Sequence, residues 1–244
     1  MIQIDIVTTS CLRARVFRKT FDSFQKHLFG SFKEHRLILN IDPIGEDESV
    51  NPVLDIAREY FGDNIKLRTP AVPNYMDAFM WVWLNADSDL QFIIEDDWVL
   101  LRPFDLNKML EIMDTHKDLA YLRFSSWGTE EKICKQWNRY YRWNGTFFEC
   151  PREFRSFLGF CGHPGIFRKE FIHSILPHLR GHGGPEKQIN GWKNKDITRI
   201  LTKWTYGVFA DQNALPGVKD IGRKWRTATG FHKDSAMRFK KWIR

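Results

Sequence analysis

Apolar positions in the first hundred residues alternate between the spacing of strands and the spacing of helices. Short runs rich in β-branched residues predict strands, and apolar residues that recur every three or four positions predict the helices between them. We expect strands at residues 2–7, 37–43, 65–67 and 90–94, and helices at residues 12–28, 53–61 and 74–84. Such alternation is typical of a mainly parallel sheet covered by helices on both faces. The pattern therefore predicts an α/β fold.

The regular alternation stops in the second half of the chain. A helix at residues 105–116 and a strand at 119–124 are followed by a segment, residues 125–160, that is rich in aromatic and arginine side chains. Beyond it the pattern predicts helices at residues 168–179 and 194–203, a strand at 205–210 and a short amphipathic helix at 234–244. Because neither a repeat nor a linker divides the chain, we expect one domain over residues 1–244, with a smaller C-terminal subregion beside the sheet.

Composition and length narrow the class of protein. Hydrophobic residues make up 43% of the 244 residues, enough for one core that buries roughly three quarters of the unfolded surface. The longest apolar stretch, about nine residues from Ala78 to Ala86, is shorter than the roughly twenty that a membrane-spanning helix needs. The N-terminus lacks the features of a secretory signal. We therefore expect a cytoplasmic protein, in the host cytoplasm if a phage encodes it. The cysteines have neither metal-site nor disulfide spacing, so free thiols are expected at Cys11, Cys134, Cys150 and Cys161.

Positive charge is concentrated at the C-terminal end. The formal net charge is +7, and residues 223–244 account for all of it, because they hold eight Lys or Arg residues and one Asp. A basic segment on a neutral body favours a polyanion nearby, such as a nucleotide diphosphate, a nucleic acid or an anionic membrane surface. A solvated basic tail is the alternative.

Three consecutive carboxylates, Glu95-Asp96-Asp97, directly follow the apolar strand at residues 90–94. Side chains alternate along an extended chain, so Glu95 and Asp97 are expected on one side and Asp96 on the other. The carboxyl ends of parallel strands are the expected ligand site of an open α/β fold. Two carboxylates there favour Mg²⁺ or Mn²⁺, which commonly bind one or two carboxylates together with substrate phosphates. A solvated acidic turn is the alternative.

With these carboxylates the sequence resembles the GT-A glycosyltransferases, whose Asp-x-Asp motif occupies this place. The resemblance is clearest over the first 110 residues and rests on short motifs after them. It implies a GT-A (Rossmann-like) fold with a nucleotide-sugar-binding half at residues 1–110, an acceptor-side half at 111–222 and a basic segment at 223–244. It also implies that Asp97 is a metal ligand and Glu95 its helper, although the motif here reads Glu-x-Asp.

Other residues of the first half fit a nucleotide-sugar pocket. Hydroxyl groups, free helix N–H groups and a guanidinium favour a diphosphate, and the candidates are Thr8, Thr9, Ser10 and Arg13. The resemblance places Asp42 on the base, with an Asp-Pro turn as the alternative, and counts Glu95 and Asp96 among the donor-binding residues. The chain has neither a Gly-x-Gly-x-x-Gly nor a Walker motif, which disfavours dehydrogenases and P-loop enzymes.

The later motifs resemble the acceptor side and the closing segment of the same family. Gly162 and His163, within the glycine-bearing residues 159–165, resemble the acceptor loop. Glu186 resembles the general base of inverting enzymes, and an acid at a helix N-terminus is the alternative. The segment around residues 220–233 resembles the part that closes over the diphosphate. It implies His232 as a further metal ligand, with Asp220 able to fill that role, and Arg223 and Lys233 on the phosphates; ordinary surface residues are the alternative.

Together these features predict a metal-dependent glycosyltransferase that uses a nucleotide-sugar, with UDP favoured, and Mn²⁺ or Mg²⁺. The charge distribution and the segment rich in arginine and aromatic residues favour DNA as acceptor, and the resemblance to a small phage-type glycosyltransferase implies a 5-hydroxymethylpyrimidine in that DNA. Tyr141, Arg142 and Trp143 are then candidates for stacking on the acceptor and holding its phosphates. A hairpin that packs these aromatic residues into the core is the alternative. An acceptor on a polysaccharide or lipid-linked glycan, and a non-catalytic nucleic-acid-binding protein, are the competing functions.

Overall fold

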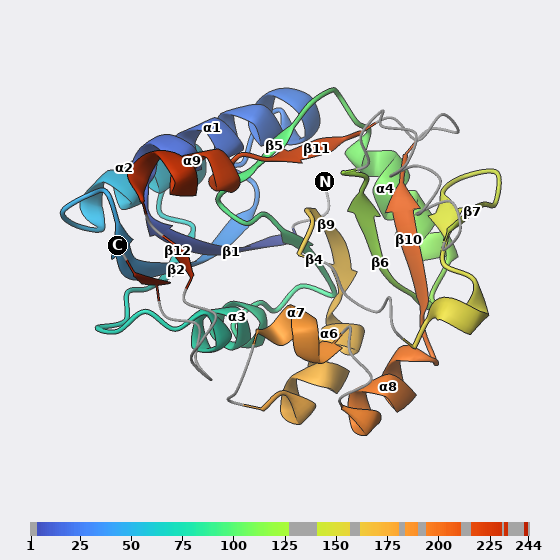
Figure 1. Cartoon of the computed structure of the whole chain (residues 1–244). Helices are drawn as coiled ribbons and strands as arrows, with labels where there is room; N and C mark the ends of the chain where they lie inside the picture. Colours follow the sequence, from blue (N-terminus) through green and yellow to red (C-terminus); the bar gives the residue numbers. More distant parts are fainter. Residues whose placement is uncertain are drawn as a thin grey trace.

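Nine strands form one central sheet in the computed structural model of the chain (Figure 1). The structure describes residues 4–126, 141–156, 162–180, 184–189, 194–210 and 216–230, and the backbone of 232–233 and 242–243. The strands follow the order β3-β2-β1-β4-β9-β6-β10-β8-β7. In chain order they are β1 (Asp5–Leu12), β2 (Arg36–Gly45), β3 (Ile65–Arg68), β4 (Leu90–Ile93), β6 (Leu119–Phe124), β7 (Arg142–Trp143), β8 (Phe148–Glu149), β9 (Gly165–Arg168) and β10 (Thr205–Phe209).

The sheet is mainly parallel, as predicted. Strands β3, β2, β1 and β4 run parallel to one another, and so do β6 and β10. Strand β9 lies antiparallel between β4 and β6. This strand was not predicted, because its four residues carry no periodic pattern. It begins at Gly165, where a Cβ atom would lie 2.4 Å from the Cα of Arg123, so only glycine permits so close an approach of the two strands.

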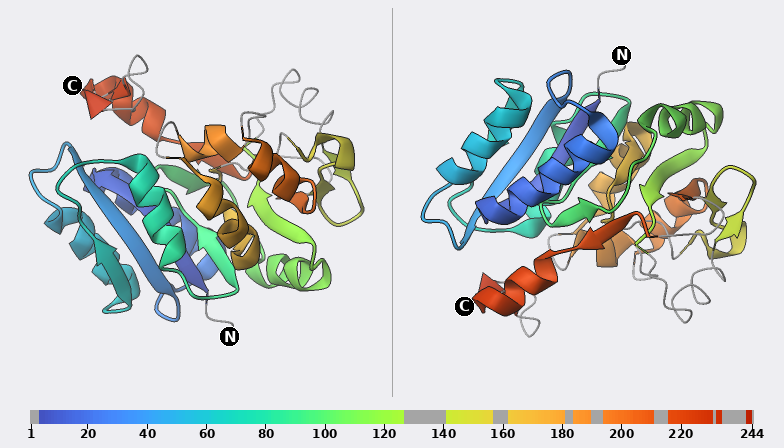
Figure 2. Two further views of the ribbon diagram at one scale, coloured as in Figure 1. Left: turned by 90° about the horizontal axis from the view of Figure 1, so that it is seen from below. Right: turned by 90° about the horizontal axis from the view of Figure 1, so that it is seen from above.

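Helices cover both faces of the sheet, and each view in Figure 2 shows one layer in front of the strands. One face carries α1 (Ala14–Phe24), α2 (Asn51–Phe61) and α4 (Leu106–Thr115), whose apolar sides share a core with it. The other face carries α3 (Tyr75–Leu84), α6 (Lys169–Ile175), α7 (Pro185–Ile189) and α8 (Lys195–Leu201). The chain thus has the predicted α/β architecture. None of the helices among the described residues is long and apolar enough to cross a membrane.

The first strand is longer than the sequence pattern predicted. The triplet Thr8-Thr9-Ser10 was expected in a loop, but it lies within β1 and pairs with Leu39, Asn40 and Ile41 of β2. Threonine is β-branched and suits a pleated strand, which explains why the polar character of the triplet did not end the ladder. Thr8 and Ser10 are buried.

The last part of the chain returns to the acidic strand end. Strand β11 (Val218–Asp220) pairs antiparallel with β5 (Trp98–Leu100), which directly follows the three carboxylates, and helix α9 (Gly222–Thr229) comes next. Short strands β12 (His232–Lys233) and β13 (Trp242–Ile243) pair with each other. For Trp242 and Ile243 the predicted amphipathic helix is therefore wrong, and the rest of residues 234–244 lies outside the described part of the chain.

Candidate functional site

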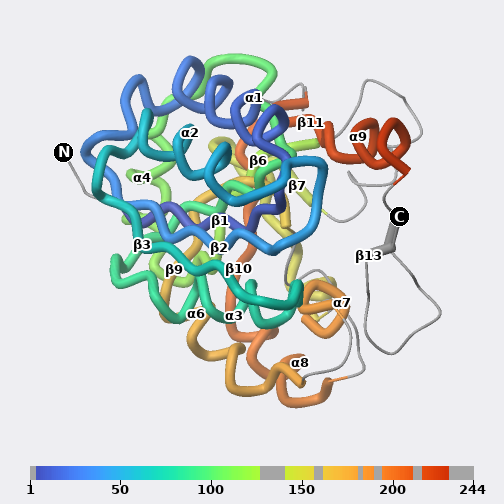
Figure 3. Tube along the Cα trace, turned by 90° about the vertical axis from the view of Figure 1, so that its left-hand side faces the viewer, coloured from blue at the N-terminus to red at the C-terminus, as the bar shows by residue number. Residues whose placement is uncertain are grey.

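A cavity of about 200 Å³ lies at the carboxyl ends of β1, β2 and β4. Figure 3 shows α7 and α9 at this edge of the sheet, on the opposite side of the molecule from the N-terminus. The polar residues that line the cavity are Thr9, Ser10, Arg13, Asp42, Tyr75, Glu95, Asp96, Asp97, Glu186, Lys187 and Arg226. The site therefore combines residues of both halves of the chain with a cation from the basic C-terminal segment.

The middle carboxylate of the acidic strand end is buried among hydrogen-bond donors. Asp96 is 1% exposed, and its Oδ2 accepts hydrogen bonds from Ser10 Oγ at 2.7 Å, the Cys11 backbone N–H at 3.2 Å and Arg13 Nε at 2.8 Å. Its backbone carbonyl accepts a hydrogen bond from Thr20 Oγ1 at 2.8 Å. With its side chain enclosed by these donors, Asp96 joins β1, α1 and the end of β4.

Glu95 and Asp97 are half-buried and line the cavity. Tyr75 Oη donates a hydrogen bond to Glu95 Oε1 at 2.7 Å. Asp97 lies against the start of α9: its carbonyl accepts from the Ile221 N–H at 2.8 Å, and a Cβ atom on Gly222 would lie 2.0 Å from its Oδ2. The two carboxylates are thus held by α3 on one side and α9 on the other.

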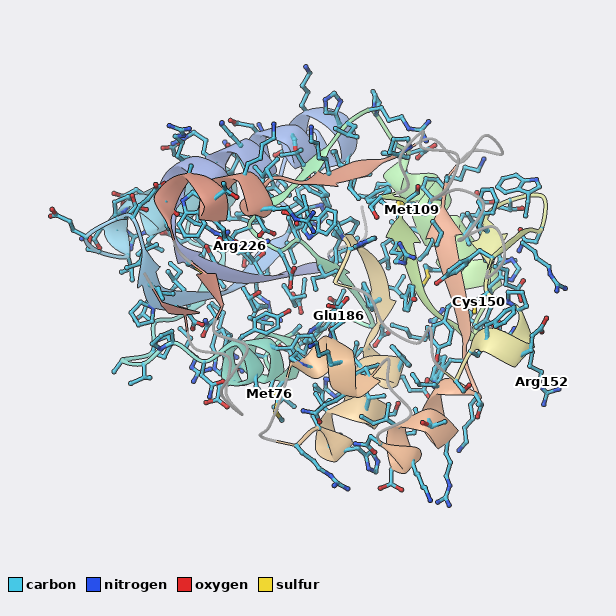
Figure 4. The ribbon with its side chains drawn as sticks, viewed as in Figure 1. Met76, Met109, Cys150, Arg152, Glu186 and Arg226 are labelled. Atoms are coloured by element: carbon cyan, nitrogen blue, oxygen red, sulfur yellow. The ribbon has the colours of Figure 1, made fainter. Side chains whose placement is uncertain are left out.

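Glu186 joins these acids from the first turn of α7. Its Oε1 accepts a hydrogen bond from the Gly162 N–H at 3.4 Å, and a Cβ atom on Gly162 would lie 3.4 Å from Glu95 Oε2. Burial and then the negative charges of Glu95, Glu186 and Asp97 raise the pKa of Tyr75 well above its ordinary value. Figure 4 shows Glu186 and Arg226 pointing toward each other from α7 and α9.

Asp42 lies at the edge of the cavity, near the end of β2. It is 5% exposed and accepts a hydrogen bond from Asn40 Nδ2 at 2.9 Å. Burial raises the pKa of this carboxyl, although Asn40 and Arg68 act in the opposite direction. The structure therefore places Asp42 beside the acids, where it could accept a hydrogen bond from a heterocyclic base. Of the three hydroxyl residues before Arg13, Thr9 and Ser10 line the cavity.

The predicted C-terminal contacts are rearranged by helix α9. Arg226 lines the cavity, whereas Arg223 lies exposed outside it. Asp220 does not line the cavity; its Oδ1 accepts hydrogen bonds from the N–H groups of Gly222 and Arg223 at 2.7 and 3.2 Å, as a cap of α9. The side chains of His232 and Lys233 lie outside the described part of the structure.

Of the predicted acceptor residues, Gly162 lies next to Glu95 and Glu186, and His163 follows it in the chain. Strand β9 runs antiparallel, so its amino end reaches the carboxyl ends of β4 and β6 and brings both residues there. The His163 ring packs on Trp98 with centroids 4.6 Å apart, and Arg123 Nη1 lies 2.8 Å from its Nδ1. Burial and the Arg123 charge lower the pKa of His163 well below its ordinary value, which keeps the ring neutral.

The other three predicted acceptor residues are not brought to this cavity. Tyr141 is 2% exposed and lies in the core beneath Arg123. Arg142 and Trp143 form β7, the edge strand five steps from β4, which corresponds to about 24 Å at the usual strand spacing. Phe148, which pairs with Trp143, is also buried. The described part of this segment is the hairpin that packs aromatic residues into the core.

The residues present fit a hard divalent cation that a diphosphate helps to bind. Within the described ranges no three His, Cys, Asp or Glu side chains are grouped so that they could hold a metal ion alone. Mg²⁺ and Mn²⁺ need only one or two carboxylates when substrate phosphates supply further oxygens, and Glu95 and Asp97 provide that number. The absence of a side chain at Gly222 lets the Asp97 carboxylate lie where it does, because a Cβ atom there would be 2.0 Å from its Oδ2.

Replacing Gly222 with Ala is expected to weaken donor and metal binding about tenfold or more. The new Cβ atom would lie 2.0 Å from Asp97 Oδ2, so either the carboxylate or the start of α9 must move. Titration calorimetry with Mn²⁺ and UDP measures the effect. Lys224→Ala, at an exposed position of the same helix, is the matched control and should bind like the wild-type protein. Unchanged affinity in Gly222→Ala would show that Asp97 does not need its present position.

Solved structures with the same architecture are glycosyltransferases. Residues 1–349 of TarS from S. aureus match with a TM-score of 0.58 and 11% identity, over 86% of this chain and 59% of that chain. PcManGT, a mannosyltransferase from Pyrobaculum calidifontis in complex with GDP-Man and Mn²⁺, matches with a TM-score of 0.57 and 9% identity, over 88% and 56%. The fold is that of the GT-A glycosyltransferases. The chain spans less than two thirds of each of these GT-A chains. No protein-family model and no curated protein matches the sequence.

A TarS complex with UDP-GlcNAc, at a TM-score of 0.55 and 12% identity over 86% of this chain and 57% of that chain, shows the same GT-A likeness.

Several residues of the site were not predicted from the sequence, among them Lys187, which lines the cavity. Tyr75 and Arg226 line the cavity, and Trp225 packs on Arg13. Tyr75 looked like one more aromatic residue of an apolar helix. Arg226 is one of eight cations in the basic segment. The signal that could have singled it out is its position one turn after Gly222, which can be used only when α9 is recognised as a helix.

Proposed function

We propose that the chain is a metal-dependent glycosyltransferase that moves a sugar from a nucleotide-sugar, with UDP favoured, to a hydroxyl group. The observation that carries the proposal is the meeting of Glu95, Asp97 and Glu186 in one cavity at the carboxyl ends of the strands. The GT-A fold supports this assignment, since structures with the same fold hold UDP-GlcNAc or GDP-Man and Mn²⁺.

The chemistry follows from where the charges lie. A divalent ion held by Asp97 and Glu95 would act as a Lewis acid toward the departing diphosphate. Arg226 adds a positive charge to the same cavity and would stabilise the negative charge that develops on the leaving group. Glu186 would accept the proton of the acceptor hydroxyl as that oxygen attacks the anomeric carbon. Asp42 would orient the base, and Gly162, through its N–H group, would hold the Glu186 carboxylate.

A polyanionic acceptor, with hydroxymethylated DNA as the first candidate, is supported by the charge of α9. Arg223 and Lys224 are exposed on that helix, next to the turn that carries Arg226 into the cavity. Cations on the rim of a site attract a polyanion and raise its rate of encounter. A hydroxyl group of a polysaccharide or of a lipid-linked glycan is the alternative acceptor.

The proposal is tested by incubating the protein with Mn²⁺ or Mg²⁺ and a panel of UDP- and GDP-sugars while the released diphosphate is measured. Each reaction is run alone, with hydroxymethylated duplex DNA, with unmodified duplex DNA and with neutral oligosaccharides. Metal-dependent release from at least one donor is expected, and it should be faster with the true acceptor. Release from none of the donors under any of these conditions would contradict the proposal.

Replacing Glu186 with Gln is expected to lower kcat for transfer by about 10²–10⁴-fold, the usual contribution of a general base. The amide keeps the size and the hydrogen bond from Gly162 but no longer accepts the proton. Donor binding should remain close to that of the wild-type protein. Steady-state rates at saturating acceptor, together with calorimetric donor affinity, separate the two effects. Lys187→Gln on the same helix is an informative comparison, because it alters the charge of the cavity without removing the base.

A further inference from the structure

Arg13 occupies the junction between the acidic strand end and helix α9. Only 5% of its side chain is exposed. Its Nε and Nη2 atoms contact the two carboxylate oxygens of Asp96, and Nη2 also donates a hydrogen bond to Asp97 Oδ2 at 3.1 Å. One guanidinium thus holds two consecutive carboxylates.

The same guanidinium supports helix α9. Its Cζ lies 5.0 Å from the centroid of the Trp225 ring, which is 8% exposed. Arg13 Nη1 is buried and has no hydrogen-bond partner in the described part of the chain. An aromatic π face attracts a cation and accepts N–H groups weakly, so the Trp225 ring is suited to cover this nitrogen. Val16, Ile44 and Ile221 complete the small apolar cluster around the ring.

These contacts give Arg13 a different role from the one expected from the sequence. To donate to a diphosphate through Nε or Nη2, the guanidinium would have to leave Asp96, which would then be a buried carboxylate without a counter-ion. Burial lowers the pKa of Arg13, but Asp96 and Asp97 raise it further, and the pKa lies well above its ordinary value. Arg13 therefore remains a charged residue of the cavity wall that Asp96 and Asp97 hold in place.

We propose that Arg13 is a positioning residue that couples the orientation of the Asp97 carboxylate to the docking of helix α9 through Trp225. Arg226 follows Trp225 directly, so the docking of α9 also decides whether a cation reaches the cavity. The inference deepens the proposed function and rests on it, because it takes Asp97 as a ligand of the metal ion. Lysine cannot replace arginine here, since an ammonium group neither bridges two carboxylates in a plane nor stacks flat on a ring.

The test uses Arg13→Lys, Trp225→Leu and the double variant in the full-length chain. Arg18→Lys is the matched control, because Arg18 lies in α1, the helix that directly follows Arg13, in an exposed ion pair with Glu59. Amide hydrogen exchange of residues 222–229 is measured without ligand, and Mn²⁺ affinity is measured by calorimetry in the presence of UDP and of GDP. Each single variant is expected to speed α9 exchange and to weaken Mn²⁺ binding by about tenfold.

The double variant distinguishes coupling from two separate losses. If Arg13 and Trp225 act as a pair, the double variant should be little worse than the worse single variant in both measurements. Faster α9 exchange in Arg13→Lys with unchanged Mn²⁺ affinity would show a merely structural role and overturn the inference. Equal behaviour of Arg13→Lys and Arg18→Lys would overturn it as well. Should Arg13→Lys not fold, Trp225→Leu decides, because it leaves the Arg13–Asp96 pair intact.

A failure of the proposed function would give different results from a failure of the Arg13–Trp225 coupling. If the wild-type protein binds no Mn²⁺ with either nucleotide, the proposed metal site is wrong, whatever the variants do. The exchange measurements need neither metal nor nucleotide, so they still decide whether Arg13 holds α9. Additive exchange effects of Arg13→Lys and Trp225→Leu would then overturn the coupling.

Discussion

Asp97→Asn is expected to lower the rate of sugar transfer by about 10³-fold, the loss that follows when several kcal/mol of metal-based charge stabilisation disappear. The amide has the shape of the carboxylate and can still lie beside Gly222, but it carries no charge for a divalent ion. Mn²⁺ binding in the presence of UDP should fall with the rate. Initial rates of diphosphate release at several Mn²⁺ concentrations measure both, since weak metal binding is partly overcome at high Mn²⁺.

Asp55→Asn provides the control for this substitution. Asp55 lies exposed on α2 in a 3.7 Å ion pair with Arg58, and the same chemical change there should leave the rate unchanged. An Asp97→Asn protein that retained more than about a tenth of the wild-type rate would contradict the assignment of Asp97 as the principal metal ligand.

The fold could be predicted where the hydrophobic period was regular. Helices α1 to α4 and strands β2, β3, β4 and β6 were expected within a few residues of their positions, because each has a clear period of its own. Strand β9 could not be predicted in this way. Its place between β4 and β6 depends on Gly165 allowing contact with Arg123, a long-range packing relation that no local pattern records.

The site could be predicted only in part, because a local sequence pattern does not show which distant residues meet there. Alternation along an extended chain does not apply to Asp96 and Asp97, which lie in a turn after β4, and all three carboxylates of residues 95–97 line the same cavity. The pattern could not show that Arg13 fills the space next to Asp96, since the two residues are 83 positions apart. Arg13 was therefore expected on a phosphate. Tyr141 was expected on an acceptor for a related reason, since an aromatic residue among arginines has the same sequence signature whether it is exposed or buried.

The contrast between neighbouring aspartates leads to the largest expected effect on stability. Asp96→Ala is expected to lower the free energy of unfolding by roughly 3–5 kcal/mol, the usual cost of removing one partner of a buried ion pair. Asp96 and Arg13 are 2% and 5% exposed in their side chains, so water cannot take the place of the lost carboxylate. Asp96 Oδ2 also serves Ser10 Oγ and the Cys11 N–H, and these buried donors would lose their acceptor too.

Urea unfolding of Asp96→Ala and Glu59→Ala measures this difference, with the midpoint compared at an unchanged slope. Glu59 pairs with Arg18 at 2.6 Å, but their side chains are 55% and 41% exposed, so its removal should shift the midpoint far less than Asp96→Ala. Equal shifts in the two variants would contradict the structural role of Asp96. Asp97→Asn should shift the midpoint far less than Asp96→Ala, because Arg13 keeps its Asp96 partner. Two adjacent aspartates would then differ in kind, with Asp96 acting on stability and Asp97 on catalysis.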